Sequence, residues 1–176
     1  MHAYNPENIV ALATPPGFGA LAIVRFSGLD LRSVHKSFSK KEPINRKAVF
    51  TKIYDPMGGG LLDESIILYY KSPQSFTGED MIEITCHGGS VVPQSIINAA
   101  IDSGFRNASP GEFSFRAFLN GKIDLLQAEA VSSLISSKSQ FSANISLQHL
   151  LGHVSTILFE IRNEAIDVLS IIENEL

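Results

Sequence analysis

The chain has 176 residues, of which 44% are hydrophobic and 18% charged, so it can bury a core and lacks the composition of a disordered protein. Its net charge of −4 disfavours a surface that binds nucleic-acid phosphates along the whole chain, although it permits a local basic patch. The single cysteine, Cys86, excludes an internal disulfide and fits a reducing compartment. No apolar run reaches the ~18 residues of a membrane span and no signal pattern opens the chain, so we expect a cytoplasmic protein with no membrane partner.

Short strands and helices separated by glycine and proline turns are predicted for the first two thirds of the chain. The double proline at 15–16 ends a first strand, and the Asp-Pro-Met-Gly-Gly-Gly segment at 55–60 predicts a hairpin turn. The predicted strands span 9–13, 20–26, 48–54, 61–71 and 81–87, with an optional edge strand at 105–108. The predicted helices in this part span 29–38, 90–103 and 111–119.

Two of the predicted strands carry charged side chains in informative positions. Arg25 falls on the same face as Leu21 and Ile23, where a guanidinium needs an acceptor. Position alone favours a strand end that reaches solvent over an anion contact. Glu83 and His87 share the polar face of another strand, and pattern alone favours an ordinary half-exposed strand there.

The last third of the chain reads as helix. Asp124 is predicted to cap a helix with Gln127 as its capping-box partner, and the serine-rich stretch 132–142 is predicted to interrupt it. From Leu147 to Ile172, apolar residues recur at alternating spacings of 4 and 3, which predicts an unbroken a/d seam. The preceding helix, another chain or residues outside this sequence could cover that seam.

The joint between the two halves mixes charged and aromatic side chains. Three phenylalanines there alternate with Glu112, Arg116 and Lys122, a mixture that predicts a ligand pocket at the joint. Gly121-Lys122 lacks the glycine and hydroxyl residues of a phosphate-binding loop, so no nucleotide-hydrolysis centre and no catalytic residue is predicted within 1–176. His149 and His153 lack a third ligand, so no metal site is predicted. A basic run at 40–47 is interpreted as a solvated loop.

Several ordered motifs are spread over nearly the whole chain. They are the segment 9–17, Arg25-Phe26-Ser27-Gly28, Ser75-Phe76-Thr77-Gly78-Glu79-Asp80, Cys86-His87-Gly88-Gly89, Pro110-Gly111-Glu112-Phe113, the segment 116–122, Asp124, and Gln127-Ala128-Glu129-Ala130. Together these motifs closely resemble the MnmE (TrmE) family of tRNA-modification GTPases. The resemblance covers the family's amino-terminal folate-binding domain and the first helices of its central helical domain.

The resemblance implies an α+β fold, in which a mixed-sheet folate-binding domain like that of aminomethyltransferases precedes long helices. It implies a folate-binding and dimerisation domain at 1–119 and the start of the central helical domain at 120–176, with the GTPase domain beyond Leu176. It implies a homodimer that binds 5-formyl-tetrahydrofolate as a one-carbon donor. With the flavoprotein MnmG (GidA), the whole protein would add a carboxymethylaminomethyl-type group to carbon 5 of the wobble uridine of tRNA. GTP hydrolysis in the absent domain would depend on potassium and magnesium.

Carried over by position, the resemblance assigns the folate contacts to Arg25, Glu83 and Lys122. A carboxylate can pair with the donor edge of a pterin, and a cation suits the glutamate tail, although these residues do not decide which cation serves it. Phe113 or Phe118 could pack the ring system. The family usually has arginine where this chain has Phe18 and Ser109, which puts auxiliary anion contacts in doubt.

Two alternatives to folate binding follow from the same residues. The departures at Phe18 and Ser109 give some weight to a purely structural dimerisation scaffold that has lost its ligand. A direct tRNA-binding module is disfavoured by the acidic pI of about 5.7 and by the lack of a basic stripe in the sequence.

Overall fold

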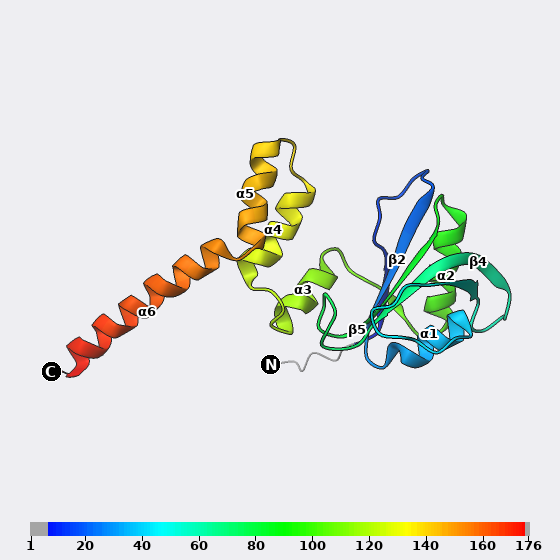
Figure 1. The fold of residues 1–176 in the computed structure, drawn as a ribbon, viewed down its shortest axis with the longest axis horizontal. Coiled ribbons are helices and arrows are strands. Elements are labelled where there is room, and N and C mark those ends of the chain that lie inside the picture. Colours follow the sequence, from blue (N-terminus) through cyan, green and yellow to red (C-terminus); the bar gives the residue numbers. More distant parts are fainter. Residues whose placement is uncertain (1–6, 175–176) are drawn as a thin grey trace. The chain divides into compact units, whose positions relative to one another are not determined.

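The computed structural model describes residues 7–174, which form six strands and six helices (Figure 1). The predicted α+β class is confirmed. The chain divides into two compact units, the first ending at Arg116 and the second beginning at Ala117. This division lies inside a helix, slightly before the boundary expected at residue 119.

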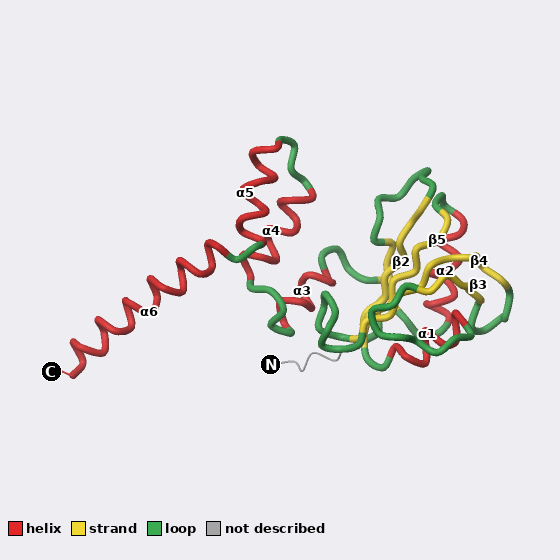
Figure 2. Tube along the Cα trace, in the orientation of Figure 1, coloured by secondary structure: helices red, strands yellow, loops and turns green. Residues whose placement is uncertain are grey.

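A six-stranded mixed sheet forms the centre of the first unit (Figure 2). Its strands are β1 (Ile9–Leu12), β2 (Leu21–Gly28), β3 (Val49–Tyr54), β4 (Leu61–Tyr70), β5 (Asp80–His87) and β6 (Arg106–Asn107). The spatial order is β3-β4-β5-β2-β1-β6, and all neighbours are antiparallel except β1 and β6. The long strands β2 and β5, distant in sequence, therefore lie side by side at the middle of the sheet.

Helices α1 (Leu31–Ser39) and α2 (Val91–Asp102) cover one face of this sheet. Alternate residues of β2 and β5, such as Val24, Phe26 and Ile84, point into a single apolar core beneath the two helices. The intervening residues point to the opposite face, as the period of a strand requires. That opposite face carries Arg25 and Glu83, so the strand alternation separates the core from the charged site.

Helix α1 is capped from a distant segment rather than by its own N-cap residue. Asp30 adopts a left-handed conformation and makes no side-chain cap hydrogen bond. Asp80, at the start of β5, accepts a hydrogen bond from the backbone N–H of Leu31 at 3.2 Å. The same carboxylate accepts from the Tyr69 hydroxyl at 2.9 Å and from the backbone N–H of Ser72 at 2.8 Å. One side chain thus joins α1, β4 and the loop that precedes β5.

A buried ion network closes the end of the first unit. Arg116 is completely buried and donates to Glu79 at 2.8 Å, to Glu112 at 2.9 Å and to the backbone carbonyl of Glu7 at 2.8 Å. Arg106 contacts both carboxylate oxygens of Glu112, at 2.8 and 2.6 Å. The hydrogen bond from Arg106, with further ones from a backbone N–H and Arg116, outweighs burial and lowers the pKa of Glu112 to about 2. The charges at the predicted joint are therefore paired with one another inside the protein, and the expectation that Glu112 and Arg116 line a ligand pocket is wrong.

The remaining helices follow α3 (Glu112–Leu119), which spans the division between the units. They are α4 (Leu125–Ile135), α5 (Gln140–Leu150) and α6 (His153–Asn174). The predicted capping box is confirmed, since Asp124 accepts from the backbone N–H of Gln127 at 2.8 Å while the Gln127 side chain accepts from the backbone N–H of Asp124. The predicted interruption between α4 and α5 is also confirmed.

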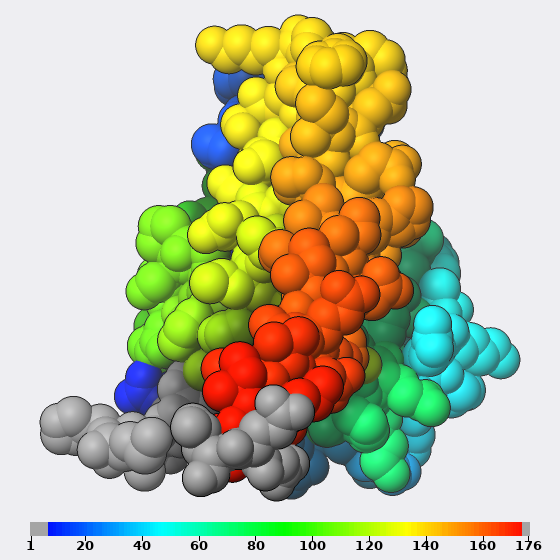
Figure 3. Space-filling view, turned by 90° about the vertical axis from the view of Figure 1, so that its left-hand side faces the viewer, coloured from blue at the N-terminus to red at the C-terminus, as the bar shows by residue number. Residues whose placement is uncertain are grey.

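The unbroken seam predicted from Leu147 to Ile172 is wrong, because the helix ends after Leu150 and a new one starts at His153. Gly152 between them has a φ of 83°, which a helix cannot contain and which glycine adopts without strain. The apolar side chains of α6 are largely exposed, and the surface of α5 and α6 faces the viewer in Figure 3 (orange to red). Within residues 7–174, no helix is both long enough and apolar enough to cross a membrane.

Candidate functional site

Arg25 and Glu83 form an ion pair on the face of the sheet that α1 and α2 leave uncovered. The two residues are directly opposite each other in the antiparallel register of β2 and β5. The Nε and Nη2 atoms of Arg25 lie 2.8 and 2.7 Å from Oε1 of Glu83. Their side chains remain 29% and 18% exposed, so the pair is held in place yet reachable from solvent. The guanidinium on an apolar strand face thus has the acceptor that it requires.

Tyr70 holds the other oxygen of the Glu83 carboxylate. Its hydroxyl, at the end of β4, donates to Oε2 of Glu83 at 3.1 Å. Burial, together with the charge of Glu83 and this hydrogen bond, raises the pKa of Tyr70, so the hydroxyl keeps its proton and acts as a donor. Both carboxylate oxygens are therefore fixed, but each can accept further hydrogen bonds because a carboxylate offers about four lone-pair positions.

Two phenylalanines flank the guanidinium group of Arg25. The Arg25 Cζ atom lies 5.7 Å from the ring centre of Phe76, in the loop before β5, and 5.6 Å from that of Phe113 on α3. Both distances fall in the range of cation–π contacts. Of the two phenylalanines that the sequence offers for packing a ring system, Phe113 is beside Arg25, whereas Phe118 belongs to the second unit.

Lys122, the third predicted contact, lies in the turn between α3 and α4 of the second unit. Its backbone N–H donates to the carbonyl of Ala117 at 2.9 Å. The structure therefore brings together two of the three predicted residues, Arg25 and Glu83. The participation of Lys122 in the same site stays a prediction.

His87 shares the strand of Glu83 but belongs to a separate polar pair. Its Nδ1 atom lies 2.7 Å from Oδ1 of Asp63, and its backbone N–H donates to Oδ2 of the same residue at 2.9 Å. Burial acts to raise the pKa of Asp63, but the hydrogen bonds from Ser65 and from His87 outweigh it and lower the pKa. Asp63 therefore stays ionised and anchors the end of β5.

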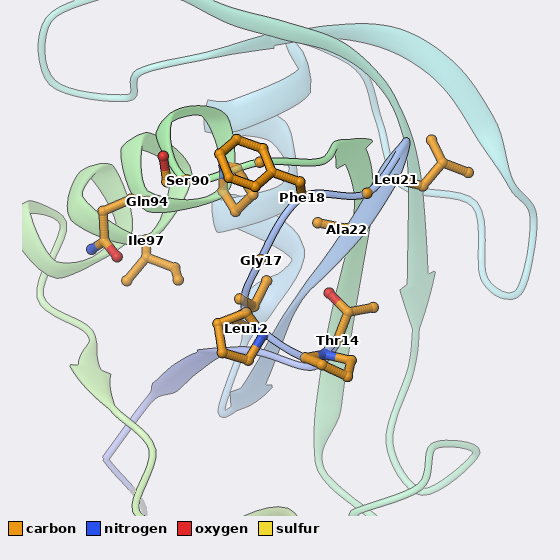
Figure 4. A pocket seen from close by; sticks show the side chains of 14 residues that line it. Leu12, Thr14, Gly17, Phe18, Leu21, Ala22, Ser90, Gln94 and Ile97 are labelled. Carbon is orange, nitrogen blue, oxygen red and sulfur yellow. The ribbon is translucent and has the colours of Figure 1, made fainter.

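A hollow of about 510 Å³ lies elsewhere in the first unit, between the loop that follows β1 and the start of α2. Figure 4 shows the loop carrying Gly17 and Phe18 beside the helix that carries Ser90, Gln94 and Ile97. The end of this loop can approach the segment between β5 and α2 because Gly88 in that segment lacks a side chain. A Cβ atom at Gly88 would lie 2.0 Å from the carbonyl oxygen of Gly19. Neither Arg25 nor Glu83 lines this hollow, whose walls are mainly apolar. The size of this hollow is not by itself evidence of function, so we assign the candidate site to the ion pair of Arg25 and Glu83.

Within the described part of the chain, no three His, Cys, Asp or Glu side chains are grouped closely enough to hold a metal ion. Cys86 is buried in the core and burial raises its pKa to about 11, so it is a poor nucleophile.

The role of Tyr70 and the contact of Phe76 with Arg25 were not predicted from the sequence. Tyr70 lies on the same face of β4 as Leu68, which pairs with Glu83, so its role can be recognised only once β4 is known to neighbour β5. Phe76 stands within one of the quoted motifs, but the sequence gives no indication that its loop folds over Arg25. Both contacts depend on the pairing of segments far apart in the chain.

Comparison with known proteins identifies the relatives of this chain. A family model described as the N-terminus of GTP-binding protein TrmE matches residues 8–122. A protein of Thermotoga petrophila named tRNA modification GTPase MnmE is 46% identical over 172 residues, which cover 97% of this chain and 38% of that protein. Proteins of the same name from Campylobacter concisus and Flavobacterium johnsoniae are 45% and 44% identical, and the matches cover 95% and 98% of this chain. The chain spans about 38% of the length of these relatives.

Proposed function

The chain belongs to the MnmE (TrmE) family of tRNA modification GTPases, and we propose that its first unit binds a reduced folate, 5-formyl-tetrahydrofolate, at Arg25 and Glu83. One observation carries the proposal: the Glu83 carboxylate is oriented by Arg25 on one oxygen and by Tyr70 on the other, and it remains accessible. A carboxylate fixed in this way is a ready acceptor for a flat ligand with adjacent N–H donors.

A pterin ring fits this chemistry. Its amide-like edge presents two neighbouring N–H groups, which a carboxylate can accept in parallel. Phe76 and Phe113 beside Arg25 offer apolar surface that favours an aromatic ring in the same place. The folate would supply the one-carbon unit, while Glu83, Arg25 and the two phenylalanines would bind and orient it.

The glutamate tail of the folate needs a cation. The family resemblance places Lys122 as well as Arg25 at the folate, and on that ground alone we assign the tail to Lys122. This assignment predicts that loss of Lys122 weakens binding of the full folate more than binding of a compound that lacks the glutamate.

The activity of the whole protein is a further part of the proposal, because this chain spans only part of its relatives. We propose that the protein forms a homodimer through the first unit and acts with the flavoprotein MnmG (GidA). Together they would install a carboxymethylaminomethyl-type group on the wobble uridine of tRNA, with GTP hydrolysis supported by potassium and magnesium outside this chain. The exposed apolar side chain of Leu21 on β2, which is separated from the β3 edge by two strands, supports the self-association.

Isothermal titration calorimetry with 5-formyl-tetrahydrofolate tests the proposal. We expect the wild-type chain to bind, and Glu83→Gln to lower the affinity by at least about tenfold, since a hydrogen bond to a charged group contributes roughly 1.5–3 kcal/mol. Asp102→Asn, at an exposed carboxylate of α2, is the matched control and should bind like the wild type.

A structural dimerisation scaffold is the alternative. Absence of folate binding by the wild type would favour it, provided that sedimentation velocity shows a dimer. Binding that Glu83→Gln leaves unchanged would reject the site while leaving a folate-binding protein.

A further inference from the structure

The chain as a whole is acidic and has no basic stripe along its length, but the segment that includes the basic run at 40–47 is locally basic. Residues 31–52 contain seven lysines and arginines but a single acidic residue, Glu42, although the whole chain has a net charge of −4. Glu42 forms ion pairs with Arg32 and Lys36 of α1. The other five cations lie at the end of α1, in the following loop and on β3. They are Lys40, Lys41, Arg46, Lys47 and Lys52.

Three of these lysines line one hollow at the free edge of the sheet. β3 is an edge strand (Figure 2), and a hollow of about 400 Å³ beside it is lined by Lys40, Lys41 and Lys52. The same hollow contains the aromatic side chains of Phe50 and Tyr54 and the carboxylate of Glu64.

The aromatic and basic groups of this hollow, which we call the β3-edge site, are close to one another. The Lys40 ammonium lies 5.8 Å from the ring centre of Tyr54, and the Lys41 ammonium lies 3.5 Å from the carbonyl oxygen of Phe50. Phe50 itself is 67% exposed, so it does not contribute the stability that a buried phenylalanine would. The site therefore presents an exposed aromatic ring beside three lysines.

Cations that alternate with exposed aromatic rings are the groups that bind single-stranded nucleic acid, because lysines neutralise phosphates while bases stack on the rings. The carboxylates of an acidic protein segment would use the lysines but would gain nothing from the ring of Phe50. We propose that the β3-edge site binds a single-stranded segment of RNA, with Lys40, Lys41 and Lys52 at its phosphates and Phe50 against a base. The choice of RNA among nucleic acids rests on the proposed function, in which the protein acts on tRNA.

Lysines on an edge strand can also serve to prevent pairing with another chain. That role predicts that loss of the lysines increases aggregation and has no effect on RNA binding. A salt titration of RNA binding distinguishes the two explanations. Loss of the lysines changes its slope only if they contact phosphates, because only those contacts release counterions from the RNA.

The test measures fluorescence anisotropy of a labelled single-stranded RNA of about 12 nucleotides, a length within the usual site sizes, over a range of salt concentrations. For the chain of 176 residues, replacing Lys40, Lys41 and Lys52 by Gln should weaken binding and reduce the slope of log K against log salt by about 2, since each phosphate contact contributes about 0.7. The matched control replaces three exposed cations elsewhere, Lys71, Lys138 and Arg162, by Gln and should keep the wild-type slope.

A second variant tests the stacking. Phe50→Ala should lower the affinity by about tenfold and leave the salt slope unchanged, because stacking involves no counterion. The proposal is overturned if the wild type does not bind the RNA, if both triple variants have the same slope, if Phe50→Ala binds normally, or if a poly-glutamate peptide binds as tightly as the RNA. Folate calorimetry is independent of these measurements, so either proposal can fail while the other stands.

Discussion

Arg116 illustrates how a single buried residue can determine the stability of the first unit. Its guanidinium is fully buried and balances the carboxylates of Glu79 and Glu112. A buried ion pair adds little net stability compared with an apolar replacement of both partners, but removal of one partner leaves an uncompensated charge. The cost of losing Arg116 should therefore greatly exceed that of losing an exposed arginine.

We predict that Arg116→Met lowers the free energy of unfolding by about 3–5 kcal/mol. Urea denaturation followed by circular dichroism measures the change. Arg32→Met removes an exposed partner of Glu42 and should leave the unfolding midpoint unchanged within error. Equal effects of the two substitutions would show that the buried network does not contribute as described.

His35 makes the stability of the first unit depend on pH. Its ring is 2% exposed, with Nδ1 at 3.2 Å from the hydroxyl of Ser39 and 3.3 Å from the carbonyl oxygen of Lys41. Burial lowers the pKa of His35 below its ordinary value of 6.5, despite the opposing effects of the hydrogen bond to Lys41 and the charge of Glu42. Below that value the unfolded chain takes up a proton that the folded chain resists, so the free energy of unfolding falls as the pH drops through 6.5.

We predict that His35→Gln flattens this part of the pH dependence, between about pH 7 and pH 5. Unfolding free energies measured across that window in the wild type and the variant provide the check. Parallel profiles for the two proteins would assign the pH dependence to other groups.

Individual site residues were only partly predictable from the sequence. The alternation of side chains along a strand is a local property, so the sequence alone places Arg25 on an apolar strand face and Glu83 on a polar one. Their mutual contact depends on the register between β2 and β5, which no local pattern encodes. The family resemblance supplied that association, whereas the roles of Tyr70 and Phe76 required the fold.

At the scale of elements, α1 depends on a cap that comes from another part of the chain. Asp80 accepts hydrogen bonds from Leu31, Tyr69 and Ser72, while Asp30 at the helix start makes no side-chain cap hydrogen bond. We predict that Asp80→Ala lowers the free energy of unfolding by about 2 kcal/mol, as expected for loss of a cap and its additional partners. Asp30→Asn, which tolerates the left-handed conformation, should be nearly neutral. Thermal denaturation of the two variants distinguishes them, and a larger loss for Asp30→Asn would refute the distant cap.

The helices show which element boundaries can be read from sequence. The capping box of α4 is local chemistry between Asp124 and Gln127, so the sequence predicts it directly. Gly152 is also local, but a glycine inside an apolar periodic pattern is often tolerated within a helix. The periodicity continues across it, and only the backbone conformation shows that α5 and α6 are separate.

At the scale of the molecule, protection should differ strongly between the central strands and the last helix. Backbone amides of β2 and β5 lie in the middle of the sheet, whereas the side chains of α6 are largely exposed. We predict by hydrogen-exchange mass spectrometry that α6 exchanges at least about tenfold faster than β2, because local opening there disrupts few buried contacts. Equal protection of α6 and β2 in the chain of 176 residues would show that another surface covers the helix.

The hydrogen bond from Arg116 to the carbonyl of Glu7 brings the first and last described residues of the first unit to one point. A domain whose entrance and exit coincide can be inserted into a longer polypeptide without altering its internal connections. It should also tolerate circular permutation, with residues 7 and 116 joined by a short linker and new termini opened in the exposed β-turn at residues 55–60. The contact made by the Arg116 guanidinium thus marks the two adjacent chain positions at which this unit could be joined to another protein.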